Sequence, residues 1–265
     1  MGRVKTRIRI LILLLCLTAL AIGQMSPFLQ MNVGTGAAIA GTYELADTAS
    51  GTALVNADTT CFARMDSLRA VTLIVVGVHD YPTMQQSAQS VTDNYGNSYT
   101  LAVTASNNVR NGRVTMFYCA NPTITGDTIR IRYRSVNQIS SYPDMAVQAW
   151  RGVASPVLDG TSTNYISGGG NTTTGSGTLT PSVATAMGGG MWGGTIVPAA
   201  NTQPTATGSL TTANQQMWWN YVLNRRLMCA IYYKTNIGTS AFTTTHTHTK
   251  FTSNPGTYAI GWAFR

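Results

Sequence analysis

Carboxylates, which most often carry out acid–base chemistry in proteins, are scarce in this sequence. Its 265 residues include nine acidic ones, and Glu44 is the only glutamate. Hydrolysis of a glycosidic bond needs two carboxyl groups placed on either side of that bond. Asp93, Asp127 and Asp159 each adjoin a Gly or Asn residue, as aspartates in turns and loops do. No Gly-x-Ser-x-Gly motif accompanies the three histidines. The sequence therefore predicts no enzymatic activity and ranks a polysaccharide hydrolase third among its functions.

His246 and His248 form a His-x-His pair in a threonine-rich run, Thr243–Lys250. Alternate residues of a β-strand project from one face, so both imidazoles could ligate one zinc or copper ion. A third ligand is not evident nearby in the sequence, although His79 and Asp80 could approach in the folded chain. We favour the simpler interpretation, a solvated strand face, and predict neither a metal nor any other cofactor.

Three arginines, Arg130, Arg132 and Arg134, alternate with apolar residues in the segment IRIRYR. In a strand this pattern gives one apolar face, directed inward, and one basic face. Most such basic stripes are solvated and discourage edge-to-edge aggregation. A functional stripe would bind an acidic polysaccharide or the anionic surface of a partner.

A cluster of aromatic residues occurs at Met217–Tyr221, MWWNY. Its adjacent tryptophans would project from opposite faces of a strand, Trp219 inward and Trp218 outward together with Asn220. An exposed aromatic ring beside an amide is a platform for a sugar ring or a protein contact. The alternative, which we favour, is a tryptophan covered by a loop.

The elements that position these side chains are predicted to be strands. Only 10% of the residues are charged, against about 25% in an average domain, and Thr, Ser, Asn and Gly take their place. That composition favours pleated sheet. Ala70–Val78 is an almost continuous apolar run, as expected of a strand buried on both faces. Further strands are predicted at Ser98–Ala105, Val114–Ala120, Asp127–Arg134, Met145–Trp150, Met217–Leu223, Leu227–Lys234 and Tyr258–Phe264.

Two pairs of predicted strands are joined by sequences typical of hairpins. Ser90–Ala102 contains the polar turn DNYGN, in which Asn and Gly tolerate positive φ. The strands on either side of Asn121–Gly126 are predicted to form a second hairpin. Of two glycine-rich stretches, Ser167–Gly177 is predicted to be a flexible loop, and Met187–Gly194 a strand packed under aromatic rings.

The first 23 residues have the features of a secretory signal peptide. Four basic residues precede a 13-residue apolar run, Ile10–Ile22, and small residues follow, with a predicted cleavage after Gly23. An uncleaved anchor is the alternative. Residues 24–51 are predicted to be an extended arm or linker, one that could add a strand to a neighbour's sheet, and residues 52–265 to be the β-domain.

Cysteine and charge add two limits. Beyond the signal, Cys61, Cys119 and Cys229 allow one internal disulfide at most, and buried thiols fit as well. The whole chain carries a net charge of +8, but four of its 17 basic residues lie in the signal. The remaining 13 against nine acidic residues give +4, without a cluster, so nucleic acid is not a predicted partner.

Three motifs together resemble a β-sandwich module of secreted bacterial and phage-encoded proteins. VTDNYGNSYTLA resembles its recurring V-T-D-x-x-G-N-x-Y hairpin. AWRGVASPVLDGTS is similar to its G-V-x-x-x-x-L-D segment, with Trp150 at the aromatic position, and YAIGWAFR is similar to its closing strand. The resemblance covers about Ala53–Arg265 and departs from the pattern in the long Gly-rich insertions. It implies a jelly-roll or immunoglobulin-like sandwich on cell surfaces, filaments or virions, generally without assigned enzymatic activity.

The sequence therefore predicts an all-β protein with a single antiparallel β-sandwich, jelly-roll or immunoglobulin-like, after an N-terminal signal or anchor helix. We expect a non-enzymatic extracellular structural or surface protein, part of a filament, cell surface or virion. It would act through self-association or contacts with other surface proteins, and would touch a membrane only through an uncleaved residue 1–23 segment. A lectin-like glycan-binding module is the alternative function.

Overall fold

The computed structural model describes twelve segments of the chain, and every element in them is a β-strand. The described residues are 43–52, 60–66, 68–80, 89–107, 110–135, 143–153, 155–166, 172–183, 187–196, 205–208, 226–248 and 257–265. All strand pairs are antiparallel, which confirms the all-β prediction. A search of these residues for a membrane-spanning helix found none. The predicted signal, most of the predicted arm, and Met217–Leu223 with Trp218 and Asn220 lie outside the described residues.

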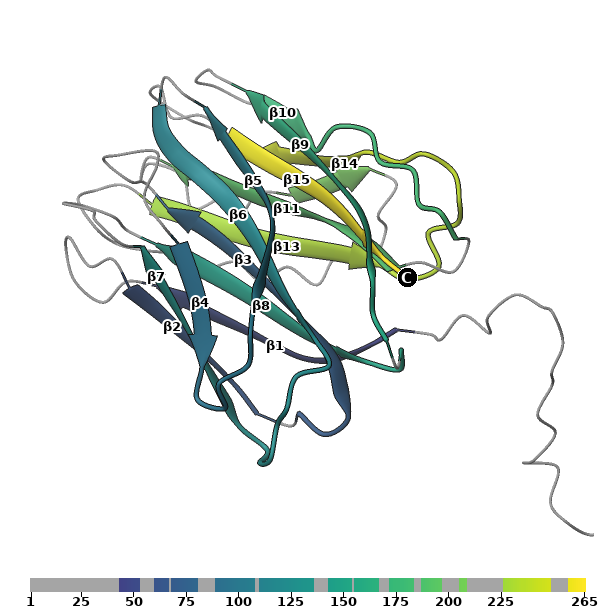
Figure 1. Ribbon diagram of the computed structural model, residues 1–265. Helices are drawn as coiled ribbons and strands as arrows, with labels where there is room; N and C mark the ends of the chain where they lie inside the picture. The colour runs from purple at the N-terminus through teal and green to yellow at the C-terminus, as the bar shows by residue number, and fades with distance from the viewer. Residues whose placement is uncertain are drawn as a thin grey trace, which may run out of the picture. The chain divides into compact units, whose positions relative to one another are not determined.

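A five-stranded sheet, here called the central sheet, lies in the middle of the described fold (Figure 1). Its strands, in spatial order, are β1 (Glu44–Thr52), β8 (Asp144–Arg151), β3 (Val71–Asp80), β6 (Arg110–Ala120) and β5 (Thr100–Asn107). β3 is buried along almost its whole length, which confirms the strand predicted at Ala70–Val78. Its apolar run has no exposed face because both faces of the central sheet are covered.

One face of the central sheet packs against a three-stranded sheet. This outer sheet consists of β2 (Thr60–Met65), β7 (Ile129–Ser135) and β4 (Gln89–Asp93), in that order. Strand β7 has strict alternation of buried and exposed residues, as a sheet with one solvated face requires. Val76 and Phe117 of the central sheet share one apolar cluster with Ile131 of β7.

The other face of the central sheet packs against a four-stranded sheet. Its strands are β13 (Arg226–Lys234), β11 (Met187–Ile196), β15 (Thr257–Phe264) and β9 (Leu158–Ile166). Trp150 of the central sheet lies in a second apolar cluster with Met191 and Trp262. Figure 1 shows the resulting order of layers, with β2, β4 and β7 at the lower left and β11, β13 and β15 to the upper right.

A small fourth sheet lies against the four-stranded sheet on its outer side. It consists of β10 (Thr172–Gly175), β14 (Thr244–His248) and β12 (Thr205–Gly208). A Cβ on Gly190 would come within 2.4 Å of the Thr244 hydroxyl, so glycine permits this approach. On the inner side, a Cβ on Gly189 would come within 2.3 Å of the Trp262 ring. The glycine-rich strand packed under aromatic rings is therefore confirmed.

The first eight strands pair in a nested pattern that local sequence did not predict. β1 pairs with β8, β2 with β7 and β3 with β6, so each of the first three strands pairs with its counterpart in the second half of the series, whereas β4 and β5 do not pair with each other. Successive strands consequently alternate between the central sheet and the β2–β7–β4 sheet, except that β6 follows β5 within the central sheet.

Both predicted hairpins are wrong in their pairing, although their strands and turns exist. β4 pairs with β7, and β5 pairs with β6, so the Ser90–Ala102 segment crosses from one sheet to the other. Asp93 stabilises the turn in which this segment crosses between the sheets. Its carboxylate accepts hydrogen bonds from the backbone N–H of Tyr95 at 2.8 Å and from the Tyr99 hydroxyl at 3.0 Å. Gly96 has φ of +76°, as the predicted turn requires.

The loop that joins β6 to β7 also crosses from the central sheet to the β2–β7–β4 sheet, and it lies beside the loop that joins β4 to β5. β6 pairs with β3, and β7 pairs with β2, so these two strands form no hairpin either. The Asn97 side chain donates to the Thr123 carbonyl and accepts from the Thr123 N–H at 2.7 Å, which ties the two crossings together. The turns therefore occur where the sequence predicted them, but each joins two strands that belong to different sheets.

Two further expectations differ from the structure. Glu44–Thr52, most of which fell within the predicted arm, forms β1 and pairs with β8 of the same chain. Within the predicted loop Ser167–Gly177, Thr172–Gly175 forms β10. Cys61, Cys119 and Cys229 are buried thiols, which confirms the second of the two alternatives for the cysteines.

Candidate functional site

The three arginines of the predicted stripe lie on the outer face of the β2–β7–β4 sheet. Arg130, Arg132 and Arg134 are all exposed, and the residues between them are buried, as the alternation in the sequence predicted. Successive arginines are separated by two residues, which places their Cα atoms roughly 6.7 Å apart along the strand. The backbone N–H of Arg130 donates to the Asn94 side-chain oxygen at 2.7 Å, which fixes this end of β7 to the β4 corner.

Strand β2 adds two side chains to this surface that sequence reasoning missed. Phe62 lies opposite Arg132 and is 37% exposed. The guanidinium carbons of Arg130 and Arg132 lie 4.9 Å and 5.7 Å from the centre of its ring, within the range of cation–π attraction. Arg64 lies opposite Arg130 and is also exposed. Thr60–Met65 alternates, but no feature of the sequence identified which strand would lie beside β7.

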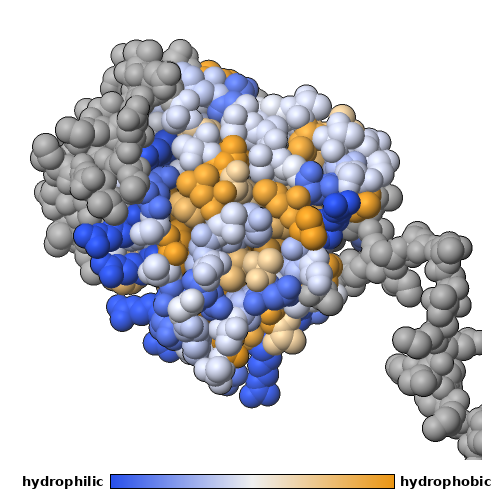
Figure 2. Space-filling model, in the orientation of Figure 1, coloured by the Kyte–Doolittle hydropathy of each residue, from blue (hydrophilic) through white to orange (hydrophobic). Residues whose placement is uncertain are grey.

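We call this surface the arginine face. It comprises Arg64, Arg130, Arg132 and Arg134, with Phe62 among them and Ser90 and Thr92 exposed on the adjoining strand β4. Figure 2 shows strongly hydrophilic side chains at the lower left, over the part of the molecule where Figure 1 places β2, β4 and β7. Arg64 pairs with Asp66 at 3.2 Å. Among the described residues, the other three arginines have no carboxylate within ion-pair distance.

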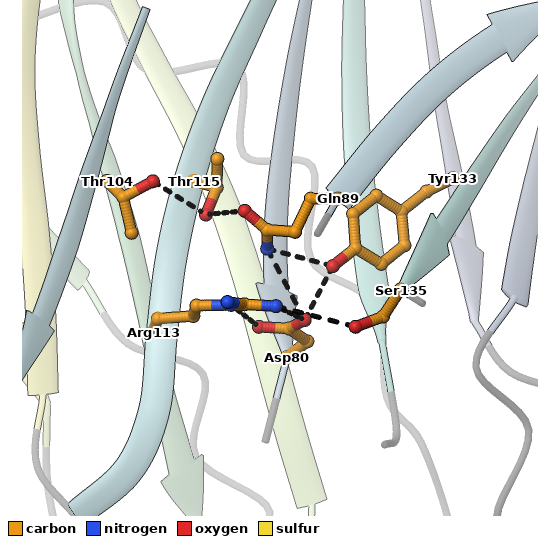
Figure 3. Close-up of polar contacts among 7 residues, drawn as sticks. All are labelled: Asp80, Gln89, Thr104, Arg113, Thr115, Tyr133 and Ser135. Carbon is orange, nitrogen blue, oxygen red and sulfur yellow. Dashed lines mark hydrogen bonds and ion pairs between the residues drawn. The ribbon is translucent and has the colours of Figure 1, made fainter. Parts of the chain in front are cut away.

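The inner side of the same sheet carries a buried polar network (Figure 3). Arg113 of β6 makes a two-pronged ion pair with Asp80 of β3, with N–O distances of 2.7 Å and 2.9 Å. Their side chains are 6% and 0% exposed. The Tyr133 hydroxyl of β7 donates to the same carboxylate at 2.5 Å, and the Gln89 amide of β4 bridges Tyr133 and Thr115.

This network joins the central sheet to the β2–β7–β4 sheet. Burial raises the pKa of Tyr133 well above its usual value, and the adjacent Asp80 charge adds to the effect, so the hydroxyl remains a donor. Burial opposes the charge of Arg113, but the hydrogen bond and the charge of Asp80 outweigh it and raise the pKa of Arg113. The ion pair joins two neighbouring strands of the central sheet, and the hydrogen bond from the Tyr133 hydroxyl to Asp80 crosses from the β2–β7–β4 sheet to this pair.

His79 lies next to Asp80 on β3 and points to the opposite face of the central sheet. It is buried and lies opposite Asp144 on β8, and its ring centre is 6.2 Å from that of Tyr258 on β15. Neither ring nitrogen has a hydrogen-bond partner within the part of the chain that the structure describes. Burial lowers the pKa of His79 to about 4, so it is neutral at pH 7. His79 and Asp80 point away from each other and do not form a shared site.

The remaining predicted site residues are dispersed. His246 and His248 lie on β14, opposite Thr174 and Thr172 of β10, so their predicted position on a strand is confirmed. A search of the described residues for three or more potential metal ligands in one place found no such group. His79 is on the central sheet, in a different layer from β14. The platform predicted at Trp218 and Asn220 lies outside the described residues.

The buried network was the feature that sequence reasoning missed most completely. Its only sequence signal is the polar pair His79-Asp80 at the end of the apolar run of β3, since a charge at the end of a buried strand needs a partner. Arg113 is 33 residues away and Tyr133 is 53 residues away from Asp80, so the partners could not be identified from spacing.

No protein-family model, curated protein or solved structure matches this chain. The function is therefore inferred from the arrangement of the residues described above.

Proposed function

We propose that this chain is a secreted, non-enzymatic structural or surface protein that works through contacts with other molecules, and that its first eight strands form a jelly-roll β-sandwich. The observation that carries the fold assignment is the nested pairing of β1 with β8, β2 with β7 and β3 with β6. A jelly roll is an eight-stranded double sheet built in this way and is common in capsid and lectin domains. The four-stranded and small sheets extend this unit.

A fold alone does not define a function, so the assignment also needs the chemistry of its residues. Three of the described carboxylates serve the fold. Asp80 neutralises Arg113 on the neighbouring strand of the central sheet, Asp93 closes the corner between β4 and β5, and Asp159 accepts hydrogen bonds from Ser182 and pairs with Arg265. The buried Asp80–Arg113 ion pair therefore joins two strands that are distant in sequence. That use supports a structural role.

The extracellular location rests on the sequence of residues 1–23, which we propose to be a signal peptide cleaved after Gly23. A chain exported in this way would carry its three remaining cysteines, Cys61, Cys119 and Cys229, as buried thiols. The buried Asp80–Arg113 ion pair and its hydrogen bond to Tyr133 would then take a stabilising role that disulfides have in many secreted domains.

The test is the state of the chain after export from an expressing host. Mass spectrometry of the secreted product reads the cleavage site, with Gln24 as the expected first residue. Analytical ultracentrifugation over a hundredfold concentration range and negative-stain electron microscopy then report self-assembly. We expect ordered oligomers or filaments. A chain that remains monomeric at the highest concentration and binds neutral sugars on a glycan array would overturn the structural assignment in favour of a lectin.

A glycan-binding function is the second candidate, and the arginine face is the observation that favours it. It combines guanidinium groups with the exposed hydroxyls of Ser90 and Thr92.

A further inference from the structure

We propose that the arginine face binds an acidic polysaccharide. This surface comprises Arg64, Arg130, Arg132 and Arg134 with Phe62, Ser90 and Thr92 on the outer side of the β2–β7–β4 sheet. Binding of a polysaccharide is a separate function from the structural one proposed above, because a protein can assemble without binding a glycan and can bind a glycan without assembling.

The arginines are held in place by the fold. β7 is the middle strand of its sheet, hydrogen-bonded to β2 on one side and β4 on the other. Its inner face is anchored by Tyr133 in the ion-pair network. On the outer face, Arg130 and Arg132 both lie over the Phe62 ring. Side chains restrained before binding lose less conformational entropy when a ligand arrives.

The chain itself offers little negative charge for these arginines. Of the nine acidic residues, Asp80 and Asp144 are buried. Asp66, Asp127 and Asp159 form ion pairs with arginines of their own chain. The carboxylates of Asp93 and Asp47 accept backbone hydrogen bonds.

Among the described residues, this leaves Glu44 as the one exposed acidic side chain without such a contact. The described residues of a second copy therefore present no acidic patch that would complement four arginines. The natural occupant is a different, anionic molecule.

Acidic polysaccharides match the pattern of groups on this surface. Each arginine can hold a carboxylate or sulfate group through two parallel hydrogen bonds. Arg130, Arg132 and Arg134 stand in a row with a regular spacing of roughly 6.7 Å, which suits a polymer with repeated charges. Ser90 and Thr92 are exposed on β4 directly opposite Arg134 and Arg132, where sugar hydroxyls between the charged groups would find partners.

Two other anionic partners fit this surface less well. Binding to an anionic membrane gains its strength from apolar side chains inserted at the interface, and Phe62 is the one large exposed hydrophobic residue of this face. Single-stranded nucleic acid binds by stacking bases on free aromatic rings. The Phe62 ring is already in contact with two guanidinium groups.

The experiment measures binding of the secreted chain to polygalacturonate and to heparin by isothermal titration calorimetry at low and at physiological salt. Dextran is the neutral control. Single-stranded DNA and phosphatidylserine vesicles are the competing partners. We expect binding to at least one acidic polysaccharide, weakened by salt, and no binding to dextran. Failure to bind either acidic polysaccharide at low salt, or tighter binding to DNA or vesicles, would falsify the proposal.

Variants locate the site. Arg132→Ser should weaken polysaccharide binding by about tenfold, since it removes a charge-assisted contact. Arg69→Ser is the matched control, because Arg69 is an exposed arginine outside the face and its loss changes the net charge equally. Equal weakening by both variants would show attraction to net charge alone and overturn the assignment of the site.

A third variant separates charge from geometry. Replacing Arg130, Arg132 and Arg134 together by lysine keeps the charge but removes the two-pronged hydrogen bonds. We expect this triple variant to bind more weakly than the original chain and to keep the same melting temperature within about 2 °C, as exposed substitutions do. Unchanged affinity would show that the row of arginines does not recognise the anionic groups individually.

Discussion

The two faces of the central sheet hold polar groups in opposite ways. Asp80 and His79 are neighbours on β3, and both are almost completely buried. Asp80 faces the β2–β7–β4 sheet, where its carboxylate accepts hydrogen bonds from the Arg113 guanidinium and the Tyr133 hydroxyl. His79 faces the four-stranded sheet, where burial keeps it neutral at pH 7. One interface contains the Asp80–Arg113 ion pair, and the other contains aromatic rings, glycines and an uncharged imidazole, with the buried Asp144 opposite that imidazole.

The difference shows that a buried titratable group has two stable solutions. It can be compensated by a hydrogen-bonded partner, or it can lose its charge. The first solution makes an interface sensitive to the loss of either partner. The second makes it sensitive to pH. The contrast can be tested on each face of the central sheet separately.

Removal of the Arg113 cation, the partner of Asp80, should have the largest effect on stability. Arg113→Met keeps much of the side-chain volume but leaves Asp80 buried without its partner. We expect the free energy of unfolding at pH 7 to fall by about 3–5 kcal/mol, as for other broken buried ion pairs. Urea denaturation followed by tryptophan fluorescence measures the change. Arg130→Met is the matched control on the exposed face and should change stability by less than about 0.5 kcal/mol. Equal losses in the two variants would contradict the distinction between paired and free arginines.

The uncharged interface should respond to acid. The pKa of His79 is about 4 in the folded chain, below the usual unfolded value of about 6.5. Above pH 6.5 His79 is neutral in both states and contributes no pH dependence. As the pH falls from 6.5 to 4, the unfolded state binds the proton first, so stability decreases by up to about 3 kcal/mol.

Denaturant unfolding at half-unit steps between pH 7 and pH 4 measures this slope. His79→Leu should remove it over that range, and the slope due to carboxylates below pH 4 should remain. Asp144, Cys229 and Tyr258 lie near His79 on the facing strands. An identical slope in the variant would assign the acid sensitivity to other groups.

Loss of the hydroxyl that supports Asp80 should have a smaller effect than loss of Arg113. Tyr133→Phe keeps the ring in the apolar cluster and removes one hydrogen bond to the carboxylate. We expect a loss of about 1.5–3 kcal/mol, typical of a hydrogen bond to a charged group. Thermal unfolding by circular dichroism gives the measurement. Tyr118→Phe removes a hydroxyl outside the network and should be close to neutral, and a larger loss there would count against the network.

Adding one methyl group to the glycine-rich interface should give the smallest of the four effects. In Gly189→Ala the new Cβ would lie within 2.0 Å of the Tyr232 carbonyl oxygen and 2.3 Å of the Trp262 ring, so the strands must shift. Overpacking of this kind costs about 1–3 kcal/mol. Met191→Leu, a substitution of similar volume on the same strand, should cost less than about 1.5 kcal/mol. A wild-type melting temperature for Gly189→Ala would show that this interface has free space.

Much of the local structure could be predicted from the sequence because it depends on local physics. The apolar run at Ala70–Val78, the alternation at Ile129–Ser135 and the close packing of Met187–Gly194 each follow from the two-residue period of a strand or the small size of glycine. The same period identified Arg130, Arg132 and Arg134 as one exposed face before their surroundings were known.

Pairing could not be predicted in the same way. The Asp93 turn has the composition of a hairpin turn, but it joins strands in different sheets, because β4 pairs with β7 and β5 pairs with β6. Each of those contacts depends on which face of a strand can bury its side chains against a distant segment. A turn of a few residues carries no information about that choice.

By itself, the sequence determined that the chain would form strands, which faces would be apolar, where turns would occur, and that a row of arginines would face outward. Which strands are neighbours depends on long-range pairing, which the sequence pattern does not show. This pairing brings Arg113 to Asp80, 33 residues away, and Phe62 beneath two arginines. The physical reason is that periodicity is a property of consecutive residues, whereas burial of a charge or exposure of a binding surface depends on the layers that long-range pairing brings together.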